Sequence, residues 1–193
     1  MLVDAVVASI ALGKLRGGRL RGLADLQLRR IDFAVVAFLI EGVITALGLK
    51  GAEAVIKLAP YLYFLSYMLL FFVILSNRDL PEMLIIGIGI FLNFLVIFLN
   101  GGKMPVSPGA LRAASMEGQI PLLESGRAVT YAILSEETSL KFLADIIPIS
   151  NPYPFHRVIS PGDVVIAVGA FILIQRAMTG RGRPVATRRK AVP

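Results

Sequence analysis

The sequence predicts an all-α integral membrane protein with about five transmembrane helices and an external segment that carries two short helices. The first observation is the stretch from Met83 to Leu99, which holds no charged residue. At about 1.5 Å per helical residue, it covers most of a hydrocarbon core roughly 30 Å thick. The second is the composition, with 56% hydrophobic and only 17% charged residues and a mean hydropathy of +0.75. The third is that the positive charges gather beside apolar runs.

Five apolar runs set the predicted spans. The first, at the N-terminus, is short, and its length also suits a re-entrant or interfacial segment. The distribution of positive charge favours a crossing. We expect Pro60 near the start of the third span, where a helix tolerates proline. Residues 1–178 are expected to form a single membrane domain, with spans at residues 2–13, 32–49, 58–76, 83–99 and 163–175.

The distribution of lysine and arginine along the chain predicts how the protein is oriented in the membrane. Of 20 such residues, six lie in residues 14–31, one is Arg78 and six lie from Arg176 onwards. With five spans these fall on one side, and the positive-inside rule makes that side cytoplasmic. The N-terminus and the external segment, residues 101–159, then face outside, and the C-terminus is cytoplasmic. If the first segment does not cross, Met1 lies inside as well.

Basic residues beside the membrane also suggest partners. We expect anionic lipids to bind near residues 14–31 and 176–193. The tail at 179–193 is basic, rich in Gly and Pro, and expected to be disordered. RNA is an alternative partner, but the tail lacks the aromatic residues that stack on bases, so we predict no nucleic acid.

Three helix starts can be recognised in the outer part of the chain. Ser107 precedes a proline at the first helical position, which predicts one short helix. Two acids follow Ser135 and predict a second, which runs to about Ile146. Ser160, with Asp163 three residues later, has the spacing of a capping box and starts the fifth span.

Composition excludes several kinds of site. The chain has no cysteine, which rules out disulfides, thiolate metal sites and thiol chemistry. The single His156 cannot form a multi-histidine site. We therefore predict no metal site, no cofactor and no catalytic residue.

Glu41 is the sharpest intramembrane candidate. A charged side chain at mid-bilayer costs about 2.5 kcal/mol or more, so it should face the bundle, pair or be protonated. Thr45 lies one turn further on and is expected on the same face. Two interpretations stay open: a relay for protons or cations, and a protonated carboxyl that holds two helices together.

Asn93 and Asn100 give the fourth span a polar stripe. With Gly89 they fall at spacings of four and seven residues. Small residues let helix backbones approach, and an asparagine amide bonds across the gap. We favour helix packing over a transport path for this stripe.

Glycines follow the fourth span. Gly101 and Gly102 either form an anion-binding nest beside Lys103 or cap the helix through positive φ, and we favour the cap. The pattern is not a Walker or dinucleotide-binding loop.

Two aspartates flank a proline-rich apolar segment. One interpretation is that Asp145 and Asp163 converge with Lys103 and His156 in an acid–base or divalent-ion site. The plainer interpretation, which we favour, is that Asp163 starts a helix while Asp145 caps a helix or pairs with Arg157.

Four short motifs occur in a recognisable order. They are Leu15-Arg-Gly-Gly-Arg-Leu20, Leu99-Asn-Gly-Gly-Lys-Met-Pro105, Phe142-Leu-Ala-Asp-Ile-Ile-Pro148 and Ser160-Pro-Gly-Asp-Val-Val165. With these motifs the chain resembles a bacterial family of multi-pass membrane proteins known as domain of unknown function 5317, over nearly its whole length. The resemblance implies a protein of the bacterial cell (inner) membrane and no activity. The positions it marks are Gly101, Gly102, Asp145 and Asp163.

Three classes of function follow. We favour a non-catalytic accessory or scaffolding subunit that packs against a membrane-protein partner. The alternative is a small proton- or ion-coupled transporter or channel that uses Glu41 and Asn93, although no internal repeat supports it. An enzyme that works at the outer surface with Asp145, Asp163 and Lys103 is the least favoured.

Overall fold

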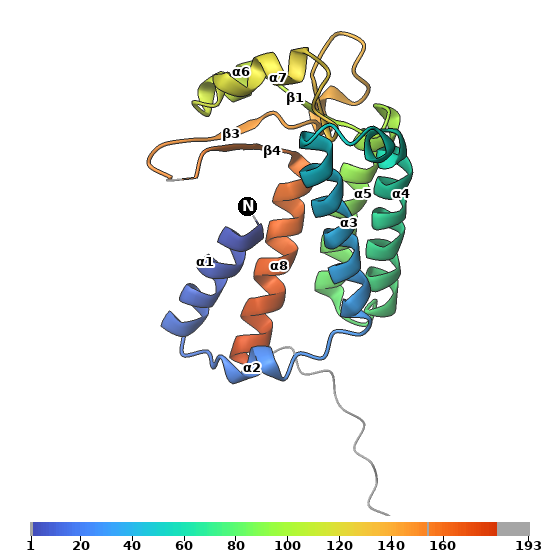
Figure 1. The fold of residues 1–193 in the computed structure, drawn as a ribbon. Coiled ribbons are helices and arrows are strands. Elements are labelled where there is room, and N and C mark those ends of the chain that lie inside the picture. The colour runs from blue at the N-terminus through green and yellow to red at the C-terminus, as the bar shows by residue number, and fades with distance from the viewer. Residues whose placement is uncertain (1, 154, 181–193) are drawn as a thin grey trace, which may run out of the picture.

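Four long helices dominate the computed structural model, which describes residues 2–153 and 155–180 (Figure 1). Each is long and apolar enough to cross a membrane. They are α3 (Ile31–Leu49), α4 (Glu53–Ser76), α5 (Pro81–Leu99) and α8 (Pro161–Thr179). The chain therefore has the character of a membrane protein, as its composition predicts.

Helix α4 differs from the prediction at its start. It begins at Glu53, so Pro60 lies inside the helix and not near its first turn. The residues between them are mostly good helix formers. Proline removes one N–H from the helix, the donor that would otherwise reach Ile56. The predicted boundary was wrong because this single loss does not end the helix.

The first predicted span is α1 (Leu2–Leu15), a helix of 14 residues. At about 1.5 Å per residue it is about 21 Å long, shorter than a hydrocarbon core. It runs beside α8 (Figure 1). The Ser9 hydroxyl donates to the Phe171 carbonyl oxygen at 3.0 Å, and the Gln175 amide donates to the Ser9 hydroxyl at 3.0 Å. A fifth crossing stays a prediction.

The helices lie in the order α3, α4, α5, α8 and α1, each in contact with the next (Figure 1). Aromatic rings fill the space between α4 and α5, where Phe71 and Phe94 meet edge to face at 5.6 Å between centroids. Phe33 of α3 meets Phe72 of α4 at 5.1 Å in the same way. Such edge-to-face pairs are favourable beyond the area they bury.

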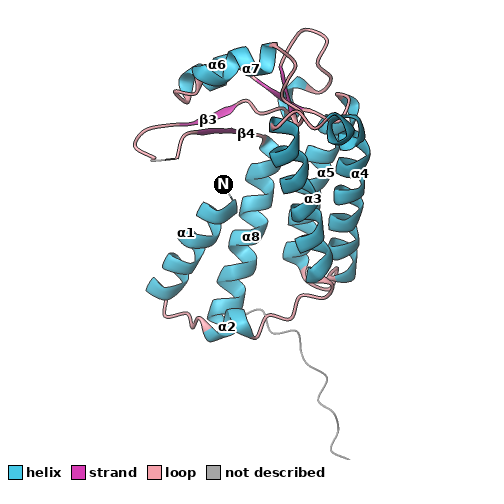
Figure 2. Cartoon of the chain, in the orientation of Figure 1, coloured by secondary structure: helices cyan, strands magenta, loops and turns pink. Residues whose placement is uncertain are grey.

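Residues 101–159, which we name the outer segment after their predicted side, combine short helices with short strands (Figure 2). Strand β1 (Met104–Val106) pairs in parallel with β2 (Tyr131–Ile133), and β3 (Ile147–Ile149) pairs antiparallel with β4 (Arg157–Ile159). Between β1 and β2 lie α6 (Pro108–Ala113), the 3-10 turn η1 (Glu117–Gln119) and α7 (Ile120–Glu124). A small core of its own holds this part together, formed by Val106, Leu111, Ile120, Leu123 and Ala128.

The predicted helix from Ser135 to Ile146 is wrong. This stretch holds only the 3-10 turn η2 (Lys141–Leu143). The side chain of Asn100 accepts a hydrogen bond from the Ser139 amide and donates one to the Ser139 carbonyl oxygen. Leu140 then takes a left-handed φ of 52°. Both features interrupt a helix, because they divert its backbone groups and its dihedral angles.

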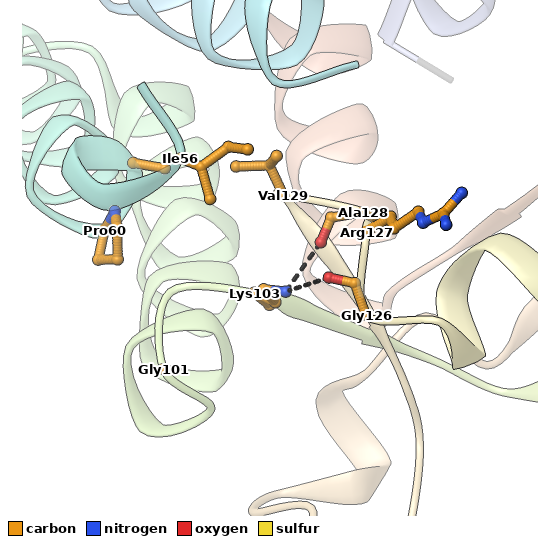
Figure 3. A pocket seen from close by; sticks show the side chains of 9 residues that line it. Ile56, Pro60, Gly101, Lys103, Gly126, Arg127, Ala128 and Val129 are labelled. Carbon is orange, nitrogen blue, oxygen red and sulfur yellow. Dashed lines mark hydrogen bonds between the residues drawn. The ribbon is translucent and has the colours of Figure 1, made fainter. Parts of the chain in front are cut away.

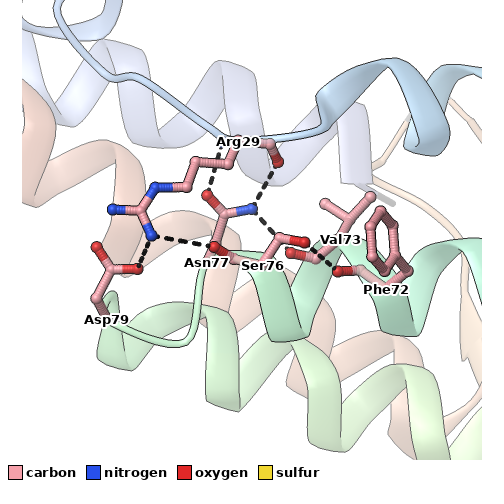
Figure 4. A network of polar contacts seen from close by, with 6 residues as sticks. All are labelled: Arg29, Phe72, Val73, Ser76, Asn77 and Asp79. Atoms are coloured by element: carbon pink, nitrogen blue, oxygen red, sulfur yellow. Dashed lines mark hydrogen bonds and ion pairs between the residues drawn. The ribbon is translucent and has the colours of Figure 1, made fainter.

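Residues 19–29, the turn between α4 and α5 and the described end of α8 lie together at the end of the bundle opposite the outer segment (Figure 1). The Arg19 amide donates to the Met178 carbonyl oxygen at 2.9 Å, next to the short helix α2 (Arg21–Ala24). The Arg29 amide donates to Asn77 at 2.8 Å (Figure 4). This agrees with the charge count that predicts one common side for these stretches. Most of the predicted disordered tail, residues 181–193, lies outside the described residues.

Candidate functional site

The joint between α5 and α8 is built on glycine. A Cβ on Gly89 would lie 2.6 Å from the carbonyl oxygen of Gly162, and a Cβ on Gly169 would lie 2.9 Å from the amide nitrogen of Ile86. Real side chains do not approach backbone atoms so closely, so only glycine fits. The two backbones are therefore in direct contact, as small residues in membrane helices permit.

Asn93 closes this joint at its outer end with a ring of hydrogen bonds. Its amide donates to Asp163 Oδ1 at 2.9 Å, and its carbonyl oxygen accepts from the Ser160 hydroxyl at 2.8 Å. Ser160 and Asp163 complete the ring as the predicted capping box of α8. Both ends of the buried Asn93 side chain are thus occupied, which favours the packing interpretation of the polar stripe.

Glu41 reaches from α3 to α4. The Ser66 hydroxyl, which is fully buried, lies 3.0 Å from Glu41 Oε1 and 2.9 Å from the Tyr63 carbonyl oxygen. One hydroxyl has a single hydrogen to donate. A protonated Glu41 that donates to Ser66 would satisfy both contacts. Thr45 does not join this contact, because its exposed hydroxyl donates to the backbone carbonyl oxygen of Glu41 at 2.9 Å.

The stretch after α5 forms the helix cap that the sequence favours. Gly101 and Gly102 have φ of 69° and 81°, a region that favours glycine. The Gly102 amide donates to the Ile97 carbonyl oxygen at 2.9 Å, as at other helix ends. The Asn100 side chain binds the backbone of Ser139 and does not face α8, so the predicted polar stripe ends at Asn93.

Lys103 holds the loop before β2. Its ammonium donates to the carbonyl oxygens of Ala128 at 2.8 Å and Gly126 at 3.4 Å (Figure 3). It is not in a salt bridge with either predicted aspartate within the described part of the chain. His156 instead lies 3.4 Å from Asn151 in the β3–β4 hairpin. These contacts bring neither Lys103 nor His156 to Asp145 or Asp163, so they do not support the alternative of one site shared by the four residues.

Asp145 lies inside the outer segment and is buried. Its backbone pairs with β1, but its buried Oδ1 has no hydrogen-bond partner among the described residues. Desolvation by burial, and then the carboxylate of Asp163, raise the pKa of Asp145 to about 8. The predicted pairing with Arg157 is wrong, because Arg157 forms its salt bridge with Asp4 at 2.8 Å.

The carboxyl groups of this region also act on Tyr131 of β2. Desolvation, followed by the charges of Asp145, Asp163 and Glu41, raises the pKa of Tyr131 to about 12. Tyr131 therefore stays a neutral phenol at physiological pH. No group of three or more His, Cys, Asp or Glu suited to a metal ion occurs in residues 2–153 and 155–180.

Several polar contacts could not be predicted residue by residue. Asn77 binds the backbone of Arg29 through both ends of its side chain (Figure 4). The buried Glu82 forms a salt bridge with Arg176, which joins α5 to α8 near the basic end. The signal available in the sequence was that each is a polar residue beside an apolar run. Their partners lie too far along the chain to be inferred.

Comparisons with known proteins agree with the resemblance found in the sequence. A protein described as uncharacterized, from Thermotoga maritima, is 33% identical over 121 residues, which cover 61% of this chain and 67% of that protein. No solved structure matches the chain. The family of unknown function DUF5317 matches residues 25–175. Because this match covers most of the chain, the protein belongs to the family of unknown function DUF5317.

Proposed function

We propose that the protein is a non-catalytic accessory or scaffolding subunit of a membrane complex. The observation that carries this proposal is the closed hydrogen-bond ring of Asn93, Ser160 and Asp163. A transport path needs polar side chains that can release their protein hydrogen-bond partners and bind the substrate instead. Here the polar groups hold two helices whose backbones are already in contact, which supports a rigid supporting role.

The surface of α3 supplies the face for a partner. Its four buried residues are Ala34, Ala37, Ile44 and Gly48. Large apolar side chains cover the rest, and the exposed ones include Val35, Val36, Phe38, Leu39 and Val43. In the proposed complex this face packs against a membrane-spanning helix of the partner, and lipid covers it in the isolated protein.

Co-purification with native mass spectrometry tests the scaffold. We expect mild detergent to extract the protein with a partner present in fixed ratio. The double substitution Phe38→Leu with Val43→Leu keeps the face apolar but changes its shape, so it should release the partner without loss of insertion. Leu75→Val on the exposed face of α4 is the matched control. Repeated recovery of a lone monomer from the unmodified chain would count against the proposal.

We propose that this subunit lies in the bacterial inner membrane, with five crossings, the outer segment outside and the basic end in the cytoplasm. The support is the positive-inside rule together with the hydrogen bonds that hold Arg19 beside the end of α8 and Arg29 beside the end of α4. The chain has no cysteine, so single cysteines can be placed freely. An impermeant maleimide on intact cells should label Glu137→Cys and not Asp25→Cys, and the reverse pattern would invert the topology.

A proton- or ion-coupled transporter is the second candidate, and Glu41 favours it. It is the carboxyl near the middle of α3, and its contact with Ser66 accommodates a proton. In Glu41→Gln the amide can still donate to Ser66, so the helices should stay packed. A proton-coupled flux that disappears in this variant would support transport. An unchanged flux would remove Glu41 from such a mechanism.

A further inference from the structure

A small pocket opens where α4 and α5 meet the outer segment (Figure 3). It has a volume of about 120 Å³. One water occupies roughly 30 Å³ in the liquid, so the pocket admits a group larger than a single water. Apolar side chains from α4 and the loop before β2 form one wall, namely Ile56, Ala59, Pro60 and Val129. Gly101, Lys103, Gly126 and Arg127 form the other.

Lys103 gives this pocket a fixed positive charge. The carbonyl oxygens of Gly126 and Ala128 hold its ammonium in place. An ammonium has three N–H donors, so one is left without an acceptor among the described residues. Lys103 is also in no salt bridge within those residues, so its charge is not neutralised by a carboxylate.

Arg127 also lines the pocket. It lies between the two residues whose carbonyl oxygens bind Lys103. Its guanidinium forms no hydrogen bond or ion pair with the rest of the described chain. In Figure 3 the exposed side chain extends away from Lys103, and a turn about its flexible stem would bring it to a shared ligand. Arginine recognises planar carboxylates and phosphates through paired N–H donors.

Gly101 lines the pocket beside free space. No heavy atom lies within 4 Å of the position that a Cβ would take on this residue. The pocket lies at the outer ends of α4 and α5, where spanning helices meet the headgroup region. A ligand there meets the Lys103 ammonium and an apolar wall, and Arg127 reaches it once its side chain turns. A phosphate group attached to a short apolar moiety has this combination of properties.

We propose that this pocket binds a phosphate group, with Lys103 as its fixed ligand and Arg127 as its second ligand. The phosphate comes either from the headgroup of an outer-leaflet phospholipid or from a soluble phosphate compound. The apolar wall of Ile56, Pro60 and Val129 contacts the glycerol and the first methylenes in the lipid case. This site is independent of the scaffold proposal, because it uses neither α3 nor the α5–α8 joint.

Binding to the purified full chain in detergent tests the site with three probes. Phosphatidylglycerol carries the phosphate and the acyl chains, diacylglycerol carries only the chains, and inorganic phosphate carries only the charge. We expect native mass spectrometry to show retained phosphatidylglycerol but not diacylglycerol if the source is lipid. Retention of inorganic phosphate alone would support the site with a soluble source.

Substitutions of the pocket residues test whether the phosphate group binds in this pocket. Loss of one charge-assisted hydrogen bond should weaken phosphate binding about tenfold in Lys103→Gln and in Arg127→Gln. Arg127→Gln leaves the contacts of Lys103 in place, so it tests the site even if Lys103→Gln fails to fold. Lys141→Gln is the matched control, because this outer lysine is paired with Glu136 away from the pocket. Equal retention of diacylglycerol, no binding of either phosphate probe, or binding unchanged in Arg127→Gln would overturn the proposal.

Discussion

Two aspartates that look alike in the sequence lie in contrasting regions of the molecule. Asp163 belongs to the α5–α8 joint, where its two oxygens accept from Asn93 and from the Ser160 amide. Asp145 belongs to the outer segment, where one buried oxygen has no partner within the described residues. The joint is fully satisfied, whereas the outer segment carries an uncompensated carboxyl. Stability should therefore fall when Asn93 of the joint loses its polar side chain and rise when the carboxyl of Asp145 is neutralised.

The contrast has a physical basis in how each region buries its backbone. The joint brings two helix backbones together through Gly89 and Gly162, so an unpaired polar group there would have no access to water. The outer segment is held by strands of three residues and short helices. Such a region unfolds locally more readily than the joint, so it can retain a buried carboxyl that lacks a hydrogen-bond partner.

The largest effect is expected when the joint is forced apart. Gly89→Ala places a Cβ 2.6 Å from the Gly162 carbonyl oxygen and 2.8 Å from the Ile166 amide nitrogen. Neither backbone atom can move without shifting α8. We expect a loss of about 3 kcal/mol or more in the free energy of unfolding. A large fall in melting temperature, followed by circular dichroism in detergent, would show it.

Gly42→Ala is the matched control for this substitution. Gly42 also lies inside a spanning helix, but no heavy atom lies within 4 Å of its added Cβ. The control should melt at or slightly above the temperature of the unmodified protein, since alanine favours helix. Equal melting temperatures for both variants would contradict the close approach of α5 and α8.

The second prediction is a gain in the free energy of unfolding, on substitution of Asp145. Asp145 keeps its proton in the folded protein up to about pH 8, whereas its ordinary pKa is 3.8. The unfolded chain therefore binds fewer protons between these values, and stability falls as the pH rises from about 4 to about 8. Asp145→Asn removes this titration. At pH 8 the variant should therefore be more stable than the unmodified protein, and the gap should close towards pH 4.

Melting temperatures at pH 5, 6.5 and 8 measure this gap. Glu136→Gln serves as the control, because Glu136 is an exposed carboxyl of the same segment. Its pH profile should follow that of the unmodified protein. A profile that keeps its slope in Asp145→Asn would mean that Asp145 is not the titrating group.

The third effect tests the hydrogen-bond ring. Asn93→Ala leaves the Ser160 hydroxyl and one oxygen of Asp163 without their partner. An unsatisfied buried group costs roughly 1–3 kcal/mol, so we expect a loss of about 2 kcal/mol. A double-mutant cycle with Ser160→Ala should give a coupling energy of about 1 kcal/mol. Strict additivity would show that the two side chains do not share a bond.

Local signals were the predictable part of this molecule. Met83 to Leu99 carries no charge, so its helix could be recognised without any knowledge of its neighbours. The capping box of α8 could be recognised because Ser160 and Asp163 are three residues apart. The glycine cap after α5 also follows from a local rule, since the backbone there needs positive φ.

Contacts between distant residues were the unpredictable part. Ser139 is bound by Asn100, and this contact replaces the helix predicted from Ser135. Arg157 forms a salt bridge with Asp4, so Asp145 lacks the partner that the sequence suggested. Propensity and capping rules describe a segment in isolation, and tertiary hydrogen bonds override them. The environment of Asp145 depends on such contacts and could not be inferred from its neighbours in sequence.

The smallest effect should stay inside the outer segment. Ser107 accepts a hydrogen bond from the Ala110 amide at 3.2 Å and starts α6. Ser107→Ala loses this cap, which is worth about 1 kcal/mol. Hydrogen exchange at the amides of α6 should become about fivefold faster, while exchange in α5 and α8 is unchanged. Ser125→Ala, which loses only an exposed hydroxyl contact with Leu122, is the control. Faster exchange in α5 and α8 as well would mean that the outer segment and the joint unfold as one unit, so the contrast between them would not hold.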